Sequence, residues 1–330
     1  MQRYTPARVP SRSVQAWVLR ESPGDYRWSE VELPAAGLDE VRVEVVASAL
    51  NHMDLWLTRG MPKPHLPHVP GCDVAGRLDD GTEVVVNPAV SCRRCDVCLA
   101  GESPLCREFQ IAGEHRWGGH ATQLVVPAAN VVPKPPNLSW EEAAAYPLAY
   151  LTAWRMLRRA RLRAGERVLV VGVGGGVSSA ALVLAKAMGA RVFGTSREEG
   201  KRKAAVALGA EDAFDSNAEW PVKADVVVEN VGPATWQQSI KALARGGRLV
   251  TCGGTSGQKV ELSLPRLFFS QHEIIGSTMG SYQEFAEVTR MVAGGVPVIV
   301  DATFSLDEYP KALARLSEGA QLGKIVLSHA

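Results

Sequence analysis

Four cysteines lie within fifteen residues of this chain, and they constrain its fold more than any other feature. Cys92, Cys95, Cys98 and Cys106 follow the spacing C-x2-C-x2-C-x7-C. Thiolates this close together suit one tetrahedral metal ion better than a set of disulfides. The alternative, two disulfides, would require an oxidising compartment, and nothing in the sequence indicates secretion. The spacing therefore predicts one Zn²⁺ in a closed four-thiolate site, which braces a loop at residues 91–107. We expect stabilising positive charge from Arg93, Arg94 and Arg107.

Length and charge narrow the class of protein. The chain has 330 residues, a length that predicts two domains. Its formal net charge of +1 disfavours nucleic acid or a membrane surface as the main partner. No apolar run is long enough to cross a bilayer. Residues 1–13 are expected to form a flexible arm rather than a targeting peptide, so the expected compartment is the cytoplasm.

The first 130 residues or so contain short strand patterns between Gly- and Pro-rich turns. Residues 40–46 alternate polar and apolar side chains, as a half-buried strand does, and 82–86 and 122–126 are shorter candidates. This half of the chain is predicted to be a small all-β barrel with a cysteine-rich excursion.

The pattern changes after Pro147, where apolar strand runs begin to alternate with helical segments. Such alternation predicts a parallel sheet with helices on both faces. A last strand at 324–327 is expected to return to the β-rich half. The other predicted strands are 168–171, 191–195, 225–228 and 248–251, and the predicted helices are 179–188 and 201–208.

A glycine cluster between the first of these strands and the next helix predicts a dinucleotide site. There, backbone N–H groups at a helix N-terminus approach a pyrophosphate. Serine takes the third glycine position of the fingerprint, and the strand–turn–helix context supports the assignment. The alternative is a tight turn without a ligand. The residues concerned are Gly172, Gly174, Gly175, Gly176 and Val177.

The end of the second strand bears on the choice of cofactor. An NAD site usually has Asp or Glu there to bind the ribose 2′-hydroxyl. Here Thr195 and Ser196 are followed by Arg197, with Lys201 and Arg202 nearby. A hydroxyl and a guanidinium suit a 2′-phosphate, which favours NADP(H) over NAD(H). Alternatively, Arg197 and Lys201 form only a solvated helix start.

Several segments together make the chain resemble the medium-chain dehydrogenase/reductase superfamily of zinc alcohol dehydrogenases and quinone oxidoreductases. The resemblance implies an α/β protein with a GroES-like β-barrel domain (14–150 and 297–330) and an inserted Rossmann domain (151–296). It also implies a homodimer or homotetramer, with hydrophobic strands near 274–275 and 296–300 as candidate contacts. The segments are ASALNHMDLW (47–56), GCDVAG (71–76), the cysteine loop, LTAW (151–154), the glycine turn, ENVG (229–232) and GKIVL (323–327).

The alcohol dehydrogenases of this superfamily hold a second, catalytic zinc, and this chain departs from their ligand pattern. Asn51 stands at the first cysteine position, Cys72-Asp73 replaces the His-Glu pair, and Leu148 stands at the last cysteine position. Met53 replaces the proton-relay hydroxyl. Leucine offers no ligand. We therefore expect one structural zinc and no catalytic zinc.

The resemblance also implies the residues around the cleft. His52 would contact the cofactor pyrophosphate or cap its local turn. Asp54 would organise the site, and Asn51 would face the nicotinamide and donate its amide to a substrate carbonyl. His115 is a candidate proton donor or a structural residue. The remaining candidates are Trp117 and Tyr150 at the substrate cleft, with a core position as the alternative for Tyr150, and Thr152 and Asn230 at the cofactor.

These features predict an NADP(H)-dependent oxidoreductase acting on a small molecule. An activated alkene or quinone is the more economical substrate, because conjugation makes its β-carbon electrophilic without a metal. Carbonyl/alcohol interconversion, with a variant metal site, is the alternative. A non-catalytic NADPH-binding protein is another, whereas a zinc-ribbon nucleic-acid binder is disfavoured by the net charge.

Overall fold

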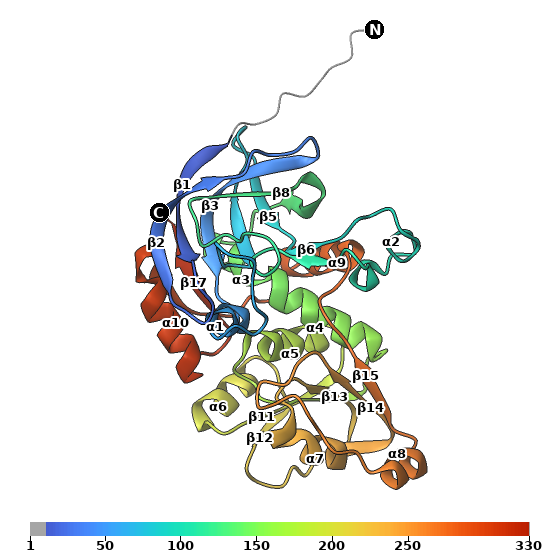
Figure 1. Cartoon of the computed structure of the whole chain (residues 1–330). Coiled ribbons are helices and arrows are strands. Elements are labelled where there is room, and N and C mark those ends of the chain that lie inside the picture. The colour runs from blue at the N-terminus through green and yellow to red at the C-terminus, as the bar shows by residue number, and fades with distance from the viewer. Residues whose placement is uncertain (1–10, 330) are drawn as a thin grey trace.

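A computed structural model describes residues 11–329 of the chain. The N-terminal part is a β-barrel, at the top of Figure 1. Its main sheet has the order β16-β17-β3-β4-β5-β9, β8 pairs with β3, and β1 and β2 form a separate antiparallel pair. The barrel strands are β1 (Arg12–Leu19), β2 (Tyr26–Leu33), β3 (Glu40–Ala49), β4 (Asp73–Arg77), β5 (Glu83–Val86), β6 (Ala89–Val90), β7 (Gln110–Ile111), β8 (Gln123–Pro127), β9 (Val131–Pro133), β16 (Val300–Ser305) and β17 (Lys324–Ser328).

The second part is a Rossmann-like domain with a six-stranded parallel sheet in the order β12-β11-β10-β13-β14-β15. It occupies the lower half of Figure 1. Its strands are β10 (Arg167–Val170), β11 (Arg191–Ser196), β12 (Asp212–Asp215), β13 (Ala224–Glu229), β14 (Leu243–Thr251) and β15 (Glu273–Gly276). The helices of the chain are α1 (His52–Thr58), α2 (Asp96–Leu99), α3 (Trp140–Ala145), α4 (Pro147–Arg159), α5 (Gly176–Ala187), α6 (Glu199–Ala207), α7 (Pro233–Ala242), α8 (Leu264–Ser270), α9 (Tyr282–Ala293) and α10 (Tyr309–Glu318).

The apolar run of β10 explains why helices cover both faces of this sheet. Val168 and Val170 pack into a core with α4 and α5, whereas Leu169 and Val171 pack on the opposite face with α7. Side chains alternate between faces, so a strand that is apolar throughout must be covered twice. The first core also includes α3 and residues of β3 and β4. The barrel and the sheet therefore share one continuous core through α3 and α4.

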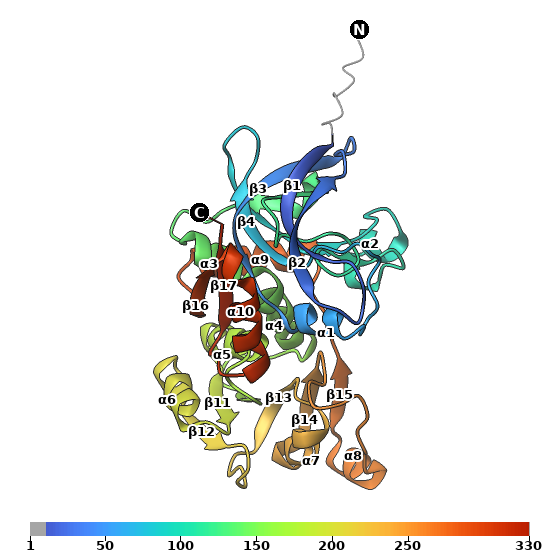
Figure 2. The same cartoon turned by 60° about the vertical axis from the view of Figure 1, so that its left-hand side comes forward.

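The chain returns to the barrel after α9. β17 pairs with β3 on one side and β16 on the other, so the predicted return of the 324–327 strand is confirmed. As a result, Lys324 at the start of β17 lies where barrel and nucleotide-binding sheet meet. Figure 2 shows α1, α4 and α5 at the same junction.

Three boundaries differ from the sequence predictions. β1 begins at Arg12 and pairs with β2, so residues 12–13 of the predicted arm (1–13) belong to a strand, and residues 1–10 lie outside the described part. The predicted domain boundary at residue 150 falls inside α4. Residues 274–275 lie in β15, but 296–299 form a non-strand connection to β16. Within residues 11–329, no helix is both long and apolar enough to span a bilayer.

Candidate functional site

The four loop cysteines converge on one point in the structure. Their Sγ atoms all lie within 4.8 Å of one another. The Cys92–Cys106, Cys95–Cys106 and Cys92–Cys98 sulfur separations are 3.5, 3.8 and 3.9 Å. Four sulfurs around Zn²⁺, with Zn–S bonds of about 2.3 Å, would be roughly 3.8 Å apart. The arrangement therefore fits one tetrahedral Zn²⁺.

Backbone groups, rather than the expected arginines, polarise the thiol of Cys92. The pKa of Cys92 falls to about 6 because the N–H groups of Arg94 and Cys95 point at its sulfur. Arg93 instead stacks over Tyr282, and Arg94 pairs with Glu108 at 3.8 Å. The expectation that these two arginines stabilise the thiolates is thus wrong. A metal cation remains the group that can hold four thiolates this close together.

A buried arginine ties the cysteine loop to the rest of the molecule. Arg155 of α4 is 3% exposed and bridges Glu102 of the loop at 2.5 Å to Glu284 of α9 at 2.8 Å. Tyr282 adds a second link, since its hydroxyl accepts from Ser91 N at 3.3 Å. Figure 1 shows the loop with α2 projecting to one side, away from α1. The loop is therefore an external brace.

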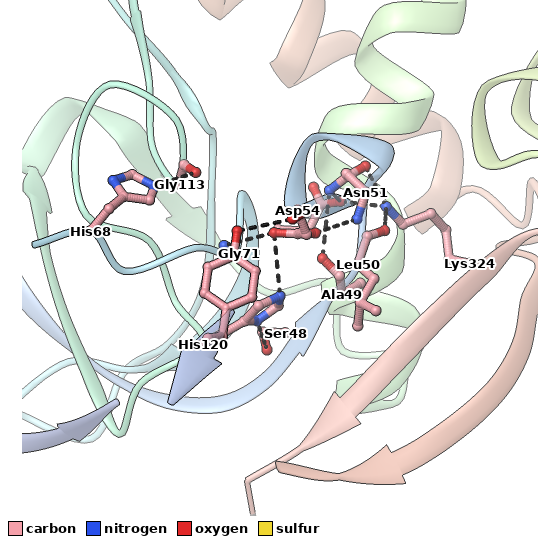
Figure 3. Close-up of polar contacts among 12 residues, drawn as sticks. Ser48, Ala49, Leu50, Asn51, Asp54, His68, Gly71, Gly113, His120 and Lys324 are labelled. Carbon is pink, nitrogen blue, oxygen red and sulfur yellow. Dashed lines mark hydrogen bonds and ion pairs between the residues drawn. The ribbon is translucent and has the colours of Figure 1, made fainter. Parts of the chain in front are cut away.

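A second polar cluster forms at the N-terminus of α1 (Figure 3). Asp54 is fully buried, and its carboxylate accepts from Asn51 N at 2.7 Å and Gly71 N at 3.2 Å. These bonds hold the start of α1 against the segment that leads into β4. Asp54 therefore holds the start of α1 in place, and the organising role that the resemblance implies stays a prediction. It is a buried positioning residue rather than a group that meets substrate.

The carboxylate of Asp73 lies at the centre of this cluster and accepts three hydrogen bonds. Its Oδ1 accepts from Leu148 N at the start of α4, at 2.6 Å. Its Oδ2 accepts from Asn51 Nδ2 at 2.9 Å and from Lys324 Nζ at 2.7 Å. The ammonium of Lys324 also reaches Asn51 Oδ1, at 2.7 Å. Asp73 and Lys324 thus form a buried ion pair with Asn51 clamped between them.

This arrangement corrects the expected role of Asn51. Its Oδ1 accepts from Lys324 and its Nδ2 donates to Asp73, with the Ala49 carbonyl 3.5 Å away. The amide is committed inside the protein and does not present itself to a substrate carbonyl. The cluster also brings together the positions where a catalytic zinc would need its ligands, namely Asn51, Cys72, Asp73 and Leu148. These side chains do not fit a metal, because the carboxylate is already paired with Lys324 and accepts three hydrogen bonds, and leucine has no ligand atom.

A chain of buried polar side chains behind Asp54 was missed by sequence reasoning. Ser48 Oγ lies 2.9 Å from His120 Nδ1 and 2.8 Å from His329 Nε2. His120 Nε2 lies 3.7 Å from Asp54 Oδ1 (Figure 3). Burial and the neighbouring His120 lower the pKa of His329 to about 3, so it stays neutral. Alternation along β3 and the return of β17 bring these residues together, and no local motif marks them.

The predicted nucleotide turn has the expected geometry between β10 and α5. Gly172 and Gly174 have positive φ angles of 73° and 146°, which favour glycine. Gly175 precedes α5, and Gly176 and Val177 form its first turn. The Thr195 hydroxyl accepts from Gly172 N at 3.1 Å and fixes the turn. The turn therefore suits a pyrophosphate at a helix N-terminus.

The residues predicted to bind the 2′-phosphate lie at the end of β11 and just after it. Ser196 is buried, and its hydroxyl accepts from Glu198 N, whereas Arg197 is exposed. Lys201 donates to Glu198 at 2.7 Å and to the Gly319 carbonyl at 2.6 Å. Arg197 is thus the exposed cation of the set, while Lys201 is engaged with the segment before β17.

His52, Asn230 and Thr152 are the other residues predicted to contact the cofactor, and they lie near the junction of the barrel and the parallel sheet. Burial and Lys324 lower the pKa of His52, so its imidazole is neutral near pH 7. Asn230 follows β13 and donates to Ser178 of α5 at 3.2 Å. The preceding Glu229, missed from the sequence, is fully buried and accepts from Val231 N at 2.7 Å. Thr152 is a buried residue of α4.

The structure corrects the substrate-cleft assignments. Trp117 lines a small hollow with Glu40 and donates to the Pro67 carbonyl, so it lies at the end of β3 opposite Asn51. Tyr150 is 1% exposed, and its hydroxyl donates to Pro297 O and accepts from Ile299 N. Both cleft assignments are wrong.

His115 is exposed and lies on a turn. Its Nδ1 accepts from Ile111 N at 3.2 Å, and its Nε2 lies 3.9 Å from Glu114. These contacts favour the structural alternative for His115 over a proton donor at the nicotinamide.

Comparisons with known proteins match both halves of the chain. Residues 37–136 match the family "Alcohol dehydrogenase GroES-like domain", and residues 176–294 match "Zinc-binding dehydrogenase". An acryloyl-coenzyme A reductase of Metallosphaera sedula is 30% identical over 334 residues, covering 96% of this chain and 100% of the relative.

Solved structures show the same arrangement. An NAD-dependent alcohol dehydrogenase is 40% identical with a TM-score of 0.91, covering 96% of this chain and 100% of that chain. A 2-octenoyl-CoA carboxylase reductase in complex with NADP and 2-octenoyl-CoA is 26% identical, with a TM-score of 0.89 and coverage of 96% and 87%. Relatives thus include proteins named for alcohols and proteins named for conjugated thioesters.

Proposed function

This chain belongs to the zinc-binding dehydrogenases of the medium-chain dehydrogenase/reductase superfamily. We propose that it is an NADP(H)-dependent reductase of activated alkenes or quinones. We further propose that each chain binds one structural zinc ion and no catalytic metal ion. The observation that carries it is the Asp73 carboxylate, whose oxygens are taken by Leu148 N, Asn51 and Lys324. A carbonyl substrate would need strong polarisation, whereas a conjugated alkene accepts hydride at its β-carbon without a Lewis acid.

The alkene class is narrowed by the relatives. The match to the acryloyl-coenzyme A reductase covers 96% of this chain, so we include α,β-unsaturated thioesters among the first substrates to test. Bound NADPH would supply the hydride, and the chain would place the dinucleotide on the turn between β10 and α5. The resulting enolate would take its proton from solvent or from the ribose hydroxyl.

Turnover with matched substrates tests this proposal. NADPH oxidation is followed with enones, quinones and short enoyl thioesters, and in parallel with saturated aldehydes, with and without added zinc. We expect turnover of the conjugated substrates that added zinc does not change. Alcohol oxidation or aldehyde reduction that depends on added zinc would establish the alternative metal site. Tight NADPH binding without turnover of any substrate would establish the non-catalytic alternative.

The preference for NADP(H) rests on Arg197. This exposed guanidinium follows a strand end without an acidic residue, and a guanidinium pairs well with a phosphate. Arg197→Ala should weaken NADPH binding about 10-fold to 100-fold and leave NADH binding nearly unchanged. Lys203→Ala is the matched control, because Lys203 is a nearby cation on α6, the helix that follows Arg197, and pairs with Glu199. Equal losses for both cofactors would contradict the proposal.

We also propose a homodimer joined along β15. This strand is the edge of the Rossmann sheet, and the nearby helix α8 exposes Leu264, Phe268 and Phe269. A sheet edge beside exposed aromatic rings suits a second copy of the same chain. Light scattering should report a dimer that Phe268→Ser/Phe269→Ser weakens at least about 10-fold. Val206→Ser on α6 is the control, and a monomeric native protein would contradict the proposal.

A further inference from the structure

We propose that Lys324 is the resident cation of the pocket at α1 and replaces a second metal ion as the charge that balances Asp73. Its Nζ lies 2.6 Å from Leu50 O, 2.7 Å from Asn51 Oδ1 and 2.7 Å from Asp73 Oδ2 (Figure 3). An ammonium has three N–H donors, and each has an acceptor here. The side chain is 3% exposed. The inference rests on the metal-free site of the proposed function.

The surroundings of Asp73 explain why the ammonium group of Lys324 alone can balance its charge. The carboxylate is fully buried, so it needs both a counter-charge and hydrogen bonds. Lys324 supplies the charge, and Leu148 N at the start of α4 and Asn51 Nδ2 supply the remaining bonds. A divalent ion at this carboxylate would have to displace the ammonium or lie beside a like charge.

Cys72 is the remaining side chain of the cluster that could bind a metal, and its surroundings disfavour metal binding. It is completely buried. Burial and the nearby carboxylates of Asp54 and Asp73 raise the pKa of its thiol well above the ordinary value. The thiolate, not the thiol, binds a metal. The cluster therefore offers a neutral thiol, a committed amide and a neutralised carboxylate.

The stem of Lys324 connects this pocket to the nucleotide turn. A Cβ on Gly176 would lie 2.8 Å from Lys324 Cδ, so the first residue of α5 must be small for the lysine to pass. The preceding Gly323 N donates to Gly174 O at 2.8 Å. Lys324 is thus a positioning residue, which acts through Asn51 and Asp73 and keeps them in register with the turn that receives the dinucleotide.

Metal content and stability test the inference without relying on turnover. The native protein, Lys324→Met and Asp73→Asn/Lys324→Met are saturated with Zn²⁺, dialysed and analysed for metal. Thermal unfolding is then followed from pH 5.5 to 8.5. Lys241→Met is the control, because it removes an exposed lysine paired with Glu219. We expect one equivalent of zinc in the native protein.

Lys324→Met leaves Asp73 buried without its cation, so the unfolding temperature should fall by about 5 °C or more at pH 8. An unpaired buried carboxyl has a raised pKa in the folded state, so the folded protein binds the extra proton as pH falls. The loss should therefore shrink towards pH 5.5. The double variant removes both charges and should regain most of the lost stability, with no such pH dependence.

Two results would overturn the inference. One is a second zinc equivalent retained by the native protein while Lys324 is intact. The other is a Lys324→Met protein that matches Lys241→Met in stability and pH dependence. If Lys324→Met does not fold, a double variant that also fails to fold would equally contradict the charge-pair account. Absence of alkene reduction would contradict the proposed function but leave these stability results unaffected.

Discussion

The cysteine loop and the Asp73 pocket both gather ligand-type side chains, but they differ in where the balancing positive charge comes from. In the loop, four sulfurs lie within 4.8 Å of one another and the nearby Arg93 and Arg94 turn to other partners. In the pocket, Lys324 supplies a positive charge to Asp73 and a hydrogen bond to Asn51 from within the chain. The loop therefore fits a metal ion from solution, whereas the charge of the pocket is balanced by the chain's own side chains. The comparison indicates that ligand-type residues alone do not identify a metal site, because an internal cation can occupy it.

The largest effect should come from removing the external cation. Cys98→Ser breaks the four-thiolate set, so zinc content should fall from about one equivalent to nearly none. The free energy of unfolding should drop by ~4 kcal/mol or more, because structural zinc contributes folding energy directly. Proteolysis should then cut within residues 91–107, whereas NADPH affinity should change less than about 3-fold. Cys252→Ser, outside the loop, is the control. Loss of NADPH binding in parallel with zinc would break the comparison.

A smaller effect should follow from removing the anion of the pocket. Asp73→Asn leaves the Lys324 ammonium buried without a carboxylate and should cost ~3 kcal/mol at pH 7. An unpaired buried ammonium has a folded-state pKa below its unfolded value of about 10.4, so the unfolded chain binds more protons in that window. Stability should therefore rise as pH increases, opposite to the Lys324→Met variant.

Urea unfolding at several pH values measures this slope. Asp225→Asn serves as the control, because Asp225 forms a half-exposed pair with Arg167 and should cost ~1 kcal/mol or less. A flat pH dependence for Asp73→Asn would mean that Lys324 finds another counter-charge.

The smallest effect should come from the contact that links the pocket to the nucleotide turn. Gly176→Ala places a Cβ 2.8 Å from Lys324 Cδ and should cost ~1 kcal/mol in cofactor-free protein. Gly175→Ala is a close control, since its φ is −73° and its added Cβ would meet none of the described atoms within 4 Å. Thermal unfolding without cofactor should separate the two. Equal stabilities would show that the lysine stem moves aside freely.

Sequence reasoning succeeded where the deciding residues are neighbours in the chain. The cysteine spacing and the strand–glycine–helix pattern each lie within a short segment, so local geometry fixes what they form. The βαβ alternation also predicted the parallel sheet, because an apolar run covered on both faces has few other solutions.

Prediction from the sequence failed where a residue's position depends on the direction of its side chain or on pairing with a distant segment. The resemblance placed Trp117 and Tyr150 near a cleft, yet one packs at the other end of β3 and the other is held in the core by Pro297 and Ile299. The resemblance implies that Asn51 is an open donor, and its partner Lys324 lies 273 residues away, where no local pattern reveals it. A hint was available, since a lysine that opens a buried strand needs a partner for its charge.

The distance in sequence between Asp73 and Lys324 has a consequence for synthesis. The two residues are 251 positions apart, and β17 is the strand that delivers the lysine. During translation the barrel strands that surround Asp73 emerge long before its counter-ion exists. While residue 324 is still inside the ribosome, water or a proton must stabilise this carboxylate in the nascent barrel. The barrel can therefore close fully only after β17, which carries Lys324, has emerged.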